Sequence, residues 1–334
     1  MLDLHVLGTA SARPTTKRAV SGSVLACPEG LVVLDPGEGF QDRFTSARRH
    51  LKTEPGTPRL RSRRVAAVLL THGHLDHTWG LLPWLQTSGL DGREEPLTVA
   101  GPVGTATFDH VREHGFEGTP PGDLPASDLW RQMRVWRELG ATKDLLGYPI
   151  VWRLGDVATG RWLTVTAEGM TESSAAWTPE GWSNHVLTPL VSHHSVPSCG
   201  WRIDGPTTSM VVSGDTASPG LLGTTPGPDV LVHEATYLEE HADRADAHLH
   251  STAAGAARTA QHLGARSLAL THFSARLSEA GPSLAEARTV LDGALPCVAL
   301  GDGDRLTVHP DGTVHHLTRE DVGWQPRLLV EGRR

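Results

Sequence analysis

The segment His72-Gly73-His74-Leu75-Asp76-His77 limits what this chain can be more than any other feature. It follows Val65–Leu70, an apolar run typical of a strand that is buried on both faces. Alternate side chains of a strand point to the same side, so the first two histidines can reach one metal ion. The aspartate and the third histidine continue into a turn, from which they can reach a second ion. Zinc accepts imidazole and carboxylate ligands, and the pattern therefore predicts a metal site.

Two metal sites need more ligands than one segment supplies, and further candidates follow other apolar runs. The runs are Val186–Ser192, Met210–Val212 and Leu268–Leu270, and the candidate ligands after them are His194, Asp215 and His272. Polar residues that follow buried strands meet at one edge of a sheet. We therefore expect these three residues to join the histidine segment in a site for two zinc ions, with Mn²⁺ or Fe²⁺ as possible substitutes.

The chain reads as a layered α/β fold. Short apolar runs separated by turns predict strands, and 36 glycines and 23 prolines suit a fold with many turns. Besides the runs already named, strands are expected at Leu2–Leu7, Ser23–Ala26, Leu31–Leu34, Leu97–Ala100 and Val230–Val232, and helices at about Asp128–Leu139 and Thr252–Leu263. We expect one domain over residues 1–320 and a tail over residues 321–334.

The middle of the chain, about residues 105–185, has a different composition. It holds six of the ten tryptophans: Trp130, Trp136, Trp152, Trp162, Trp177 and Trp182. The helix expected there carries a row of arginines at three-residue spacing: Arg131, Arg134 and Arg137. The row is either a solvated helix face or part of a lid that binds an anionic substrate. The tryptophans either pack a core or line an aromatic pocket, with Trp136 as a candidate contact.

Charge and cysteine content exclude several kinds of protein. The formal net charge of −8 counts against a broad, non-specific grip on nucleic acid and leaves room only for a local basic groove. Three cysteines without a CxxC pair indicate neither a disulfide framework nor a cysteine-based zinc finger. We find no signal peptide and no transmembrane segment, so we expect a soluble, cytoplasmic protein that does not bind membranes.

The ordered motifs resemble those of a known family. The HxHxDH segment resembles the signature of the metallo-β-lactamase superfamily, and the remaining motifs resemble its ribonuclease Z branch. They are LGTASARPTTKR, LDPGEGFQ, HSVPS from His194, SGDT with Asp215, HEAT with Glu234, HST with His250, and LTHFSAR with His272. The resemblance covers roughly residues 1–102 and 186–310.

This resemblance implies an αββα sandwich and a division of the metal ligands. His72, His74 and His194 would bind one zinc, Asp76, His77 and His272 the other, and Asp215 would bridge them. The reaction implied is hydrolysis of a phosphodiester by a metal-bound hydroxide, with Asp76 also orienting the nucleophile. His250, paired with Glu234, would give a proton to the leaving oxygen. Relatives in this branch are often homodimers.

Two departures from the branch leave the substrate open. Members that process tRNA carry a long arm between the HSVPS and SGDT motifs, but only residues 201–209 lie there. The loop that usually ends in Arg-Asn reads Lys17-Arg18-Ala19. Our first hypothesis is therefore a phosphodiesterase for a small or cyclic phosphodiester, with a small anionic partner favoured over tRNA.

Other functions stay open at this point. One is tRNA 3′-processing endoribonuclease activity with a relocated arm. Another is hydrolysis of a lactone, amide or sulfate ester in a specialised metabolic pathway, because the same metal site attacks carbonyls equally well. An inactive scaffold is disfavoured, since no ligand position is substituted.

Overall fold

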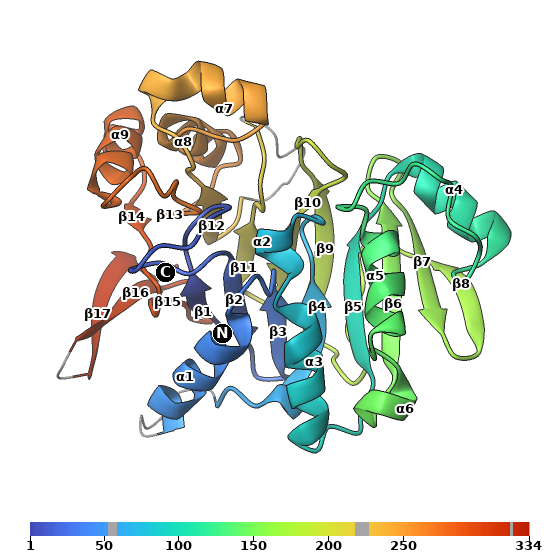
Figure 1. Cartoon of the computed structure of the whole chain (residues 1–334). Helices are drawn as coiled ribbons and strands as arrows, with labels where there is room; N and C mark the ends of the chain where they lie inside the picture. The colour runs from blue at the N-terminus through green and yellow to red at the C-terminus, as the bar shows by residue number, and fades with distance from the viewer. Residues whose placement is uncertain (53–58, 218–226, 321–322, 334) are drawn as a thin grey trace.

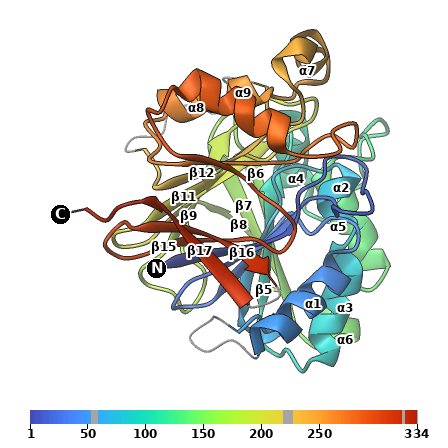
Figure 2. The ribbon, with the colours of Figure 1, turned by 90° about the vertical axis from the view of Figure 1, so that its left-hand side faces the viewer.

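Two β-sheets stacked between two layers of helices form the fold (Figure 1). The computed structural model describes residues 1–52, 59–217, 227–320 and 323–333. Figure 2 shows helices α8 and α9 on one side of the strands and α1 and α3 on the other. The αββα sandwich expected from the resemblance is thus confirmed.

The first sheet has eleven strands in the order β17-β16-β15-β1-β2-β3-β4-β5-β6-β7-β8. Strands β3, β4, β5 and β6 run parallel, and the other neighbours are antiparallel. The bounds are β1 Leu2–Gly8, β2 Gly22–Ala26, β3 Leu31–Leu34, β4 Val65–Leu69, β5 Leu97–Pro102, β6 Ile150–Asp156, β7 Arg161–Thr166, β8 Gly169–Ser173, β15 Arg305–Val308, β16 Val314–Glu320 and β17 Gly323–Val330.

The second sheet has six strands in the order β14-β13-β12-β11-β10-β9. Strands β11 to β14 are parallel, and β10 is antiparallel to both β9 and β11, so β9 shares the direction of β11. The bounds are β9 Val186–Val191, β10 Cys199–Asp204, β11 Ser209–Val212, β12 Val230–Glu234, β13 Leu268–Thr271 and β14 Cys297–Ala299.

Helices cover the outer face of each sheet. Buried side chains of α1 (Phe40–Lys52), α3 (Leu81–Leu90), α4 (Thr105–His114), α5 (Leu129–Glu138) and α6 (Lys143–Leu146) pack on the first sheet. Those of α8 (Ala253–His262) and α9 (Gly281–Leu291) pack on the second. The short elements are α2 (Leu75–Thr78), α7 (Ala242–His248), η1 (Ser62–Arg64) and η2 (Glu239–His241). Among the described residues, no helix has the length and apolar content that a membrane crossing requires.

The apolar runs of the sequence are explained by strands that are covered on both faces. Along β3, Leu31 and Val33 face the helices, whereas Val32 and Leu34 face the second sheet. Because successive side chains of a strand alternate, a strand buried on both faces needs an apolar residue at every position.

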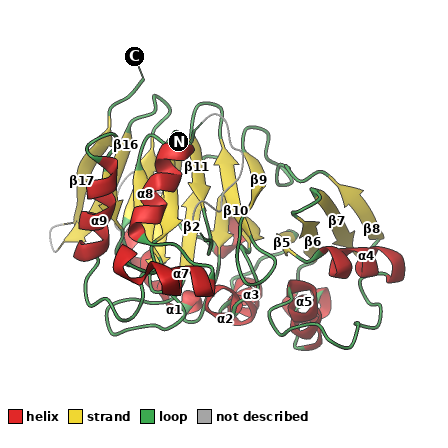
Figure 3. Ribbon diagram, turned by 90° about the horizontal axis from the view of Figure 1, so that it is seen from above, coloured by secondary structure: helices red, strands yellow, loops and turns green. Residues whose placement is uncertain are grey.

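The middle segment, residues 105–185, adds strands β6, β7 and β8 to the first sheet, and helices α4 and α5 lie next to these strands (Figure 3). Six residues of β6 pair with β5 from Leu97↔Ile150 to Pro102↔Gly155, and β7 and β8 continue the sheet. Trp130, Trp152 and Trp162 are at most 1% exposed, and Trp136 stacks on Trp152 with 6.4 Å between ring centroids. These four tryptophans are therefore core residues, because the added strands and helices need large side chains between them. Trp177 and Trp182 are half-buried against the core between the sheets.

The end of the chain corrects one expectation. Residues 321–334 were expected to form a tail, but Gly323–Val330 forms strand β17, which pairs with β16. Residues 321, 322 and 334 lie outside the described residues.

Candidate metal centre and active site

The predicted ligands meet at one edge of the sandwich because each follows the end of a strand. The histidine segment follows β4, and His194, Asp215 and His272 follow β9, β11 and β13. These last three strands share one direction, so their carboxyl ends lie at the same edge. His193, the neighbour of His194, is exposed, whereas His194 is buried.

Four of these residues form a first group: His72, His74, His194 and Asp215. Their ligand atoms all lie within 4.8 Å of one another. Nδ1 of His74 is 3.0 Å from Nε2 of His72 and 3.2 Å from Nε2 of His194. Three imidazole nitrogens that face one another in this way are arranged for a shared cation.

A second group consists of Asp76, His77, His272 and again Asp215. The Nε2 atoms of His77 and His272 are 3.3 Å apart. Oδ2 of Asp76 lies 3.5 Å from the first of these nitrogens and 3.6 Å from the second. Two imidazoles and two carboxylates form a donor set that suits zinc.

Asp215 belongs to both groups and turns one oxygen to each. Its Oδ1 lies 3.4 Å from His77 Nε2 and 3.3 Å from His272 Nε2. Its Oδ2 lies 3.7 Å from His72 Nε2 and 3.9 Å from His194 Nε2. The Oδ1 atom is buried and has no hydrogen-bond partner among the described residues. A buried carboxylate oxygen in this state fits a metal ligand, and the two oxygens fit a bridge between two ions.

The electrostatics of the site also fit cations. Burial lowers the pKa values of His72, His74 and His194, which keeps these imidazoles in the neutral form that binds metal. Burial opposes charge on His77 too, but the carboxylates of Asp215, Asp76 and Asp35 raise its pKa well above the usual range. Without metal ions, a protonated histidine such as His77 would have to offset the negative charge of these buried carboxylates.

His250 and Glu234 form a separate pair beside the shared aspartate. Nδ1 of His250 lies 2.9 Å from Oε1 of Glu234 and 3.8 Å from Oδ2 of Asp215. Burial lowers the pKa of His250, but Glu234 and then Asp215 outweigh burial and raise it to about 9. With Nδ1–H directed at Glu234, Nε2 is the atom that can give a proton to a substrate.

Comparisons with known proteins agree with this geometry. The family described as "Metallo-beta-lactamase superfamily" matches residues 16–173, and the "Beta-lactamase superfamily domain" matches residues 162–273. Ribonuclease Z of Myxococcus xanthus is 32% identical over 83% of this chain and 88% of its own length. The chain belongs to the ribonuclease Z branch of the metallo-β-lactamase superfamily. It is therefore a metal-dependent hydrolase.

One further relative supports this placement, and one solved structure supports the fold. Ribonuclease Z of Pseudomonas putida is 31% identical over 96% of this chain and 98% of its own. In fold, the chain is similar to the short form of human tRNase Z. The TM-score is 0.59 and the identity 24%, over 92% of this chain and 99% of that one.

One functional residue, Asp35 of the LDPGEGFQ motif, was not predicted from the sequence. Asp35 Oδ2 accepts hydrogen bonds from His77 Nδ1 at 2.9 Å and from Thr71 Oγ1 at 2.7 Å, and its Oδ1 accepts from the Thr71 amide at 2.7 Å. A carboxylate on the far nitrogen of a metal-binding imidazole fixes its tautomer and orientation. The signal in the sequence was the LDPGEGFQ motif, because its aspartate directly follows β3 and lies at the edge of the sandwich where the metal ligands meet.

Other hydrogen bonds hold the remaining imidazoles. Nδ1 of His272 lies 2.9 Å from Thr236 Oγ1, and Nδ1 of His194 lies 2.9 Å from the carbonyl oxygen of Leu249. In the described part of the chain, only four non-glycine residues have a positive, left-handed φ. Three of them belong to this network: Asp35, Leu249 and His272. Strained backbone of this kind is typical of functional sites.

The arginine row of α5 contacts the protein's own chain and not the metal ligands. Arg131 Nη1 donates to the Leu124 carbonyl at 2.5 Å, and Arg137 forms an ion pair with Glu117 at 2.6 Å. Arg134 donates to the Gly118 carbonyl and lies over the Trp130 ring, 5.2 Å from its centroid. These contacts tie the segment before α5 to the helix.

Helix α5 nevertheless supports the metal site. Gln132 donates to the carbonyl oxygen of Gly73, between the first two histidines of the segment, at 2.6 Å. A Cβ atom on Gly73 would lie 1.8 Å from the carbonyl oxygen of Ser127, so only glycine permits this approach.

Proposed function

We propose that this chain is a zinc-dependent phosphodiesterase that cleaves RNA, as an endoribonuclease of the ribonuclease Z type. The observation that carries the proposal is the His250–Glu234 pair beside Asp215, the carboxylate common to both ligand groups. A sugar alkoxide is a poor leaving group and needs a proton, and this pair is placed to supply one. The names of the relatives support RNA as the substrate.

The chain's own residues would do most of the positioning. When bound, two ions at such a site make water more acidic and offset negative charge on phosphoryl oxygens. His72, His74 and His194 would hold one ion, and Asp76, His77 and His272 the other, with Asp215 between them. His250 would give its proton from Nε2 to the leaving oxygen. Glu234 is held by the Thr216 amide at 2.9 Å and by Thr236 Oγ1 at 2.6 Å, and it keeps His250 protonated and oriented.

The hypothesis of a small substrate loses one of its supports, the aromatic pocket, because four of the six tryptophans of residues 105–185 belong to the core. One observation still favours a small or cyclic phosphodiester. Strands β10 and β11 are joined by the short hairpin Gly205–Thr208, with Asp204 paired to Ser209, so no long arm for tRNA lies there. Homodimer formation and a cytoplasmic location remain predictions.

A substrate panel tests the proposal. The protein loaded with zinc is given precursor tRNA with a 3′ trailer, bis(p-nitrophenyl) phosphate, 2′,3′-cyclic nucleotides and lactones. Asp76→Ala serves as the inactive variant and Asp42→Ala, an exposed position on α1, as its matched control. We expect endonucleolytic cleavage of the precursor by the parent and by Asp42→Ala. Turnover of a cyclic nucleotide or a lactone with an inert precursor would refute RNA cleavage as the function.

A further inference from the structure

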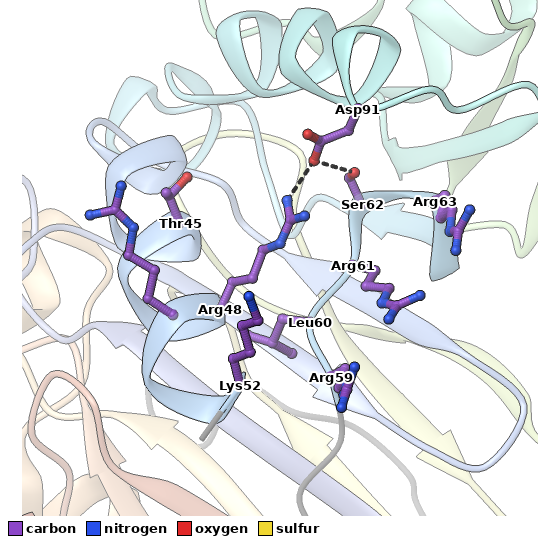
Figure 4. Close-up of a pocket in the computed structure, with 10 residues that line it drawn as sticks. Thr45, Arg48, Lys52, Arg59, Leu60, Arg61, Ser62, Arg63 and Asp91 are labelled. Atoms are coloured by element: carbon purple, nitrogen blue, oxygen red, sulfur yellow. Dashed lines mark hydrogen bonds and ion pairs between the residues drawn. The ribbon is translucent and has the colours of Figure 1, made fainter. Parts of the chain in front are cut away.

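A hollow lined mostly by cations lies at the far end of α1 (Figure 4). Its basic residues are Arg48, Arg49, Lys52, Arg59, Arg61 and Arg63, which we call the basic groove. The hollow encloses about 480 Å³ and is completed by Thr45, Leu60, Ser62 and Asp91. No part of the metal centre lines it.

The charge of the groove is opposite to that of the whole chain. Six cations and a single carboxylate line it, whereas the chain carries a formal charge of −8. Oδ2 of Asp91 accepts from Arg48 at 2.8 Å and from Ser62 at 2.9 Å. Among the described residues, the other five cations form no ion pair. Glu94 and Glu95, on the loop after Asp91, do not line the hollow.

Stabilisation of helix α1 explains only part of this cluster. Cations in the last turn of a helix interact favourably with its dipole, which accounts for Arg49 and Lys52. Arg59, Arg61 and Arg63 belong to the segment that leads into β4, and they reach the same hollow from another direction. Five cations without an ion-pair partner among the described residues converge here and repel one another, so the arrangement favours binding of a polyanion.

The position of the groove relative to the metal centre identifies the kind of polyanion. Helix α1 begins next to the site, where the Gly80 amide donates to the Pro36 carbonyl and Gly37 lies against the backbone of Asp76. Thirteen residues of helix then place the groove about 20 Å away, at a rise of about 1.5 Å per residue. A small phosphodiester in the metal centre cannot reach so far, whereas the backbone of an RNA can.

We propose that the basic groove binds phosphates of the RNA substrate at a distance from the cleaved bond. This inference rests on the proposed function, because it names the part of the protein that replaces the missing arm. Five of the six cations are arginines, whose planar guanidinium groups bind phosphate oxygens through paired hydrogen bonds. Contacts with the phosphate backbone select for the shape of the RNA and not for its sequence.

A charge-removal variant tests the groove: Arg49→Ser, Lys52→Ser, Arg59→Ser and Arg63→Ser combined. All four side chains are exposed, so the fold should survive. The matched control removes four exposed cations elsewhere, through Arg112→Ser, Lys143→Ser, Arg288→Ser and Arg327→Ser. Binding of mature tRNA is measured by fluorescence anisotropy at several salt concentrations, and kcat and KM are measured on precursor tRNA and on bis(p-nitrophenyl) phosphate.

We expect the groove variant to bind tRNA about tenfold or more weakly and to show a higher KM for the precursor. Its plot of log affinity against log salt should be shallower by roughly 3, for four lost phosphate contacts at about 0.7–0.9 each. Its turnover of the small diester should equal that of the parent and of the control. Equal tRNA binding by the groove variant and the control would overturn the inference.

Two further outcomes separate this inference from the proposed function. If the parent binds tRNA through the groove but cleaves only small diesters, the groove inference stands and the proposed function fails. Vesicles rich in phosphatidylserine probe the other common polyanion. Sedimentation of the parent with them, lost in the groove variant while tRNA binding is unchanged, would assign the groove to a membrane and overturn the inference.

Discussion

Asp35 Oδ2 lies 2.9 Å from His77 Nδ1, on the side of the imidazole that faces away from the other metal ligands. The carboxylate comes from the end of β3 and the histidine from α2, so two separate elements fix the direction of one ligand. The same carboxylate also accepts two hydrogen bonds from Thr71 and is thereby held in place itself.

Replacing Asp35 with asparagine should weaken metal binding without removing a ligand. Loss of the charged partner of a metal-binding histidine typically lowers metal affinity about 10- to 100-fold. We expect this loss in zinc titrations monitored by a competing chelator. Asp42→Asn, at an exposed position of α1, is the control and should bind zinc like the parent. Unchanged affinity in Asp35→Asn would show that the hydrogen bond does not orient His77.

Removal of metal should destabilise the protein. Asp76 and Asp215 lie close together, and without a cation only neighbouring histidines offset their repulsion. We expect chelation to lower the Tm and added zinc to restore it, because a ligand at 100 times its Kd stabilises the folded state by about 2.7 kcal/mol. Scanning fluorimetry with metal analysis of the same samples measures both effects. A Tm that is insensitive to chelation, in samples shown to be free of metal, would contradict the predicted site.

The rate of cleavage should depend on the protonation of His250. A histidine that gives a proton is active below its pKa, so the rate should fall as the pH rises through that value. Desolvation lowers the pKa of His250, but Glu234 and Asp215 raise it to about 9. Metal ions held by Asp215 would offset its negative charge, so Glu234 would be the main group that raises the pKa of His250. In Glu234→Gln the alkaline limb of the pH–rate profile should therefore move to lower pH. A limb at the same pH in both proteins would exclude His250 as the proton donor that Glu234 supports.

Trp152 should act as a core residue and not as a substrate contact. It is 1% exposed and lies between Phe116 and Trp136. Removal of a buried aromatic side chain costs about 3–5 kcal/mol, so Trp152→Ala should lower the free energy of unfolding by that amount. Leu145→Ala, at a position that is 75% exposed, should change it by less than about 0.5 kcal/mol. Denaturant unfolding measures both variants. A stable Trp152→Ala protein with a raised KM would instead restore the aromatic pocket.

The local sequence pattern predicted the strands and helices in which most residues are buried. Strand β3 has the expected bounds, and α8 begins one residue after its expected first residue, where the Thr252 hydroxyl accepts from the Gly255 amide at 2.9 Å. Helix α1 was not predicted, because its buried Phe40, Phe44 and Leu51 are separated by polar and basic residues. The apolar face of α1 is therefore narrow and hard to see in the sequence.

The site was predictable in its ligands but not in its supports. Histidines and aspartates after apolar runs are visible in the sequence, and all seven expected ligands come together. The contacts of Asp35, Thr71 and Thr236 depend on which strands become neighbours, and a hydroxyl or carboxylate at a turn has many possible partners. The sequence also could not show whether the tryptophan side chains lie in the core or in a pocket, because both placements give the same spacing of tryptophans in the sequence.

The position of Asp215 has a consequence for how the protein acquires its metal. A single side chain offers one oxygen to each group, so an ion in the first group orients the oxygen that the second group needs. Both ligand groups therefore depend on the same rotamer of Asp215, and an ion bound in one group orders the ligand oxygen of the other. We expect zinc uptake to be cooperative, with little of the half-loaded form at equilibrium, and activity to rise more steeply than in proportion to added zinc.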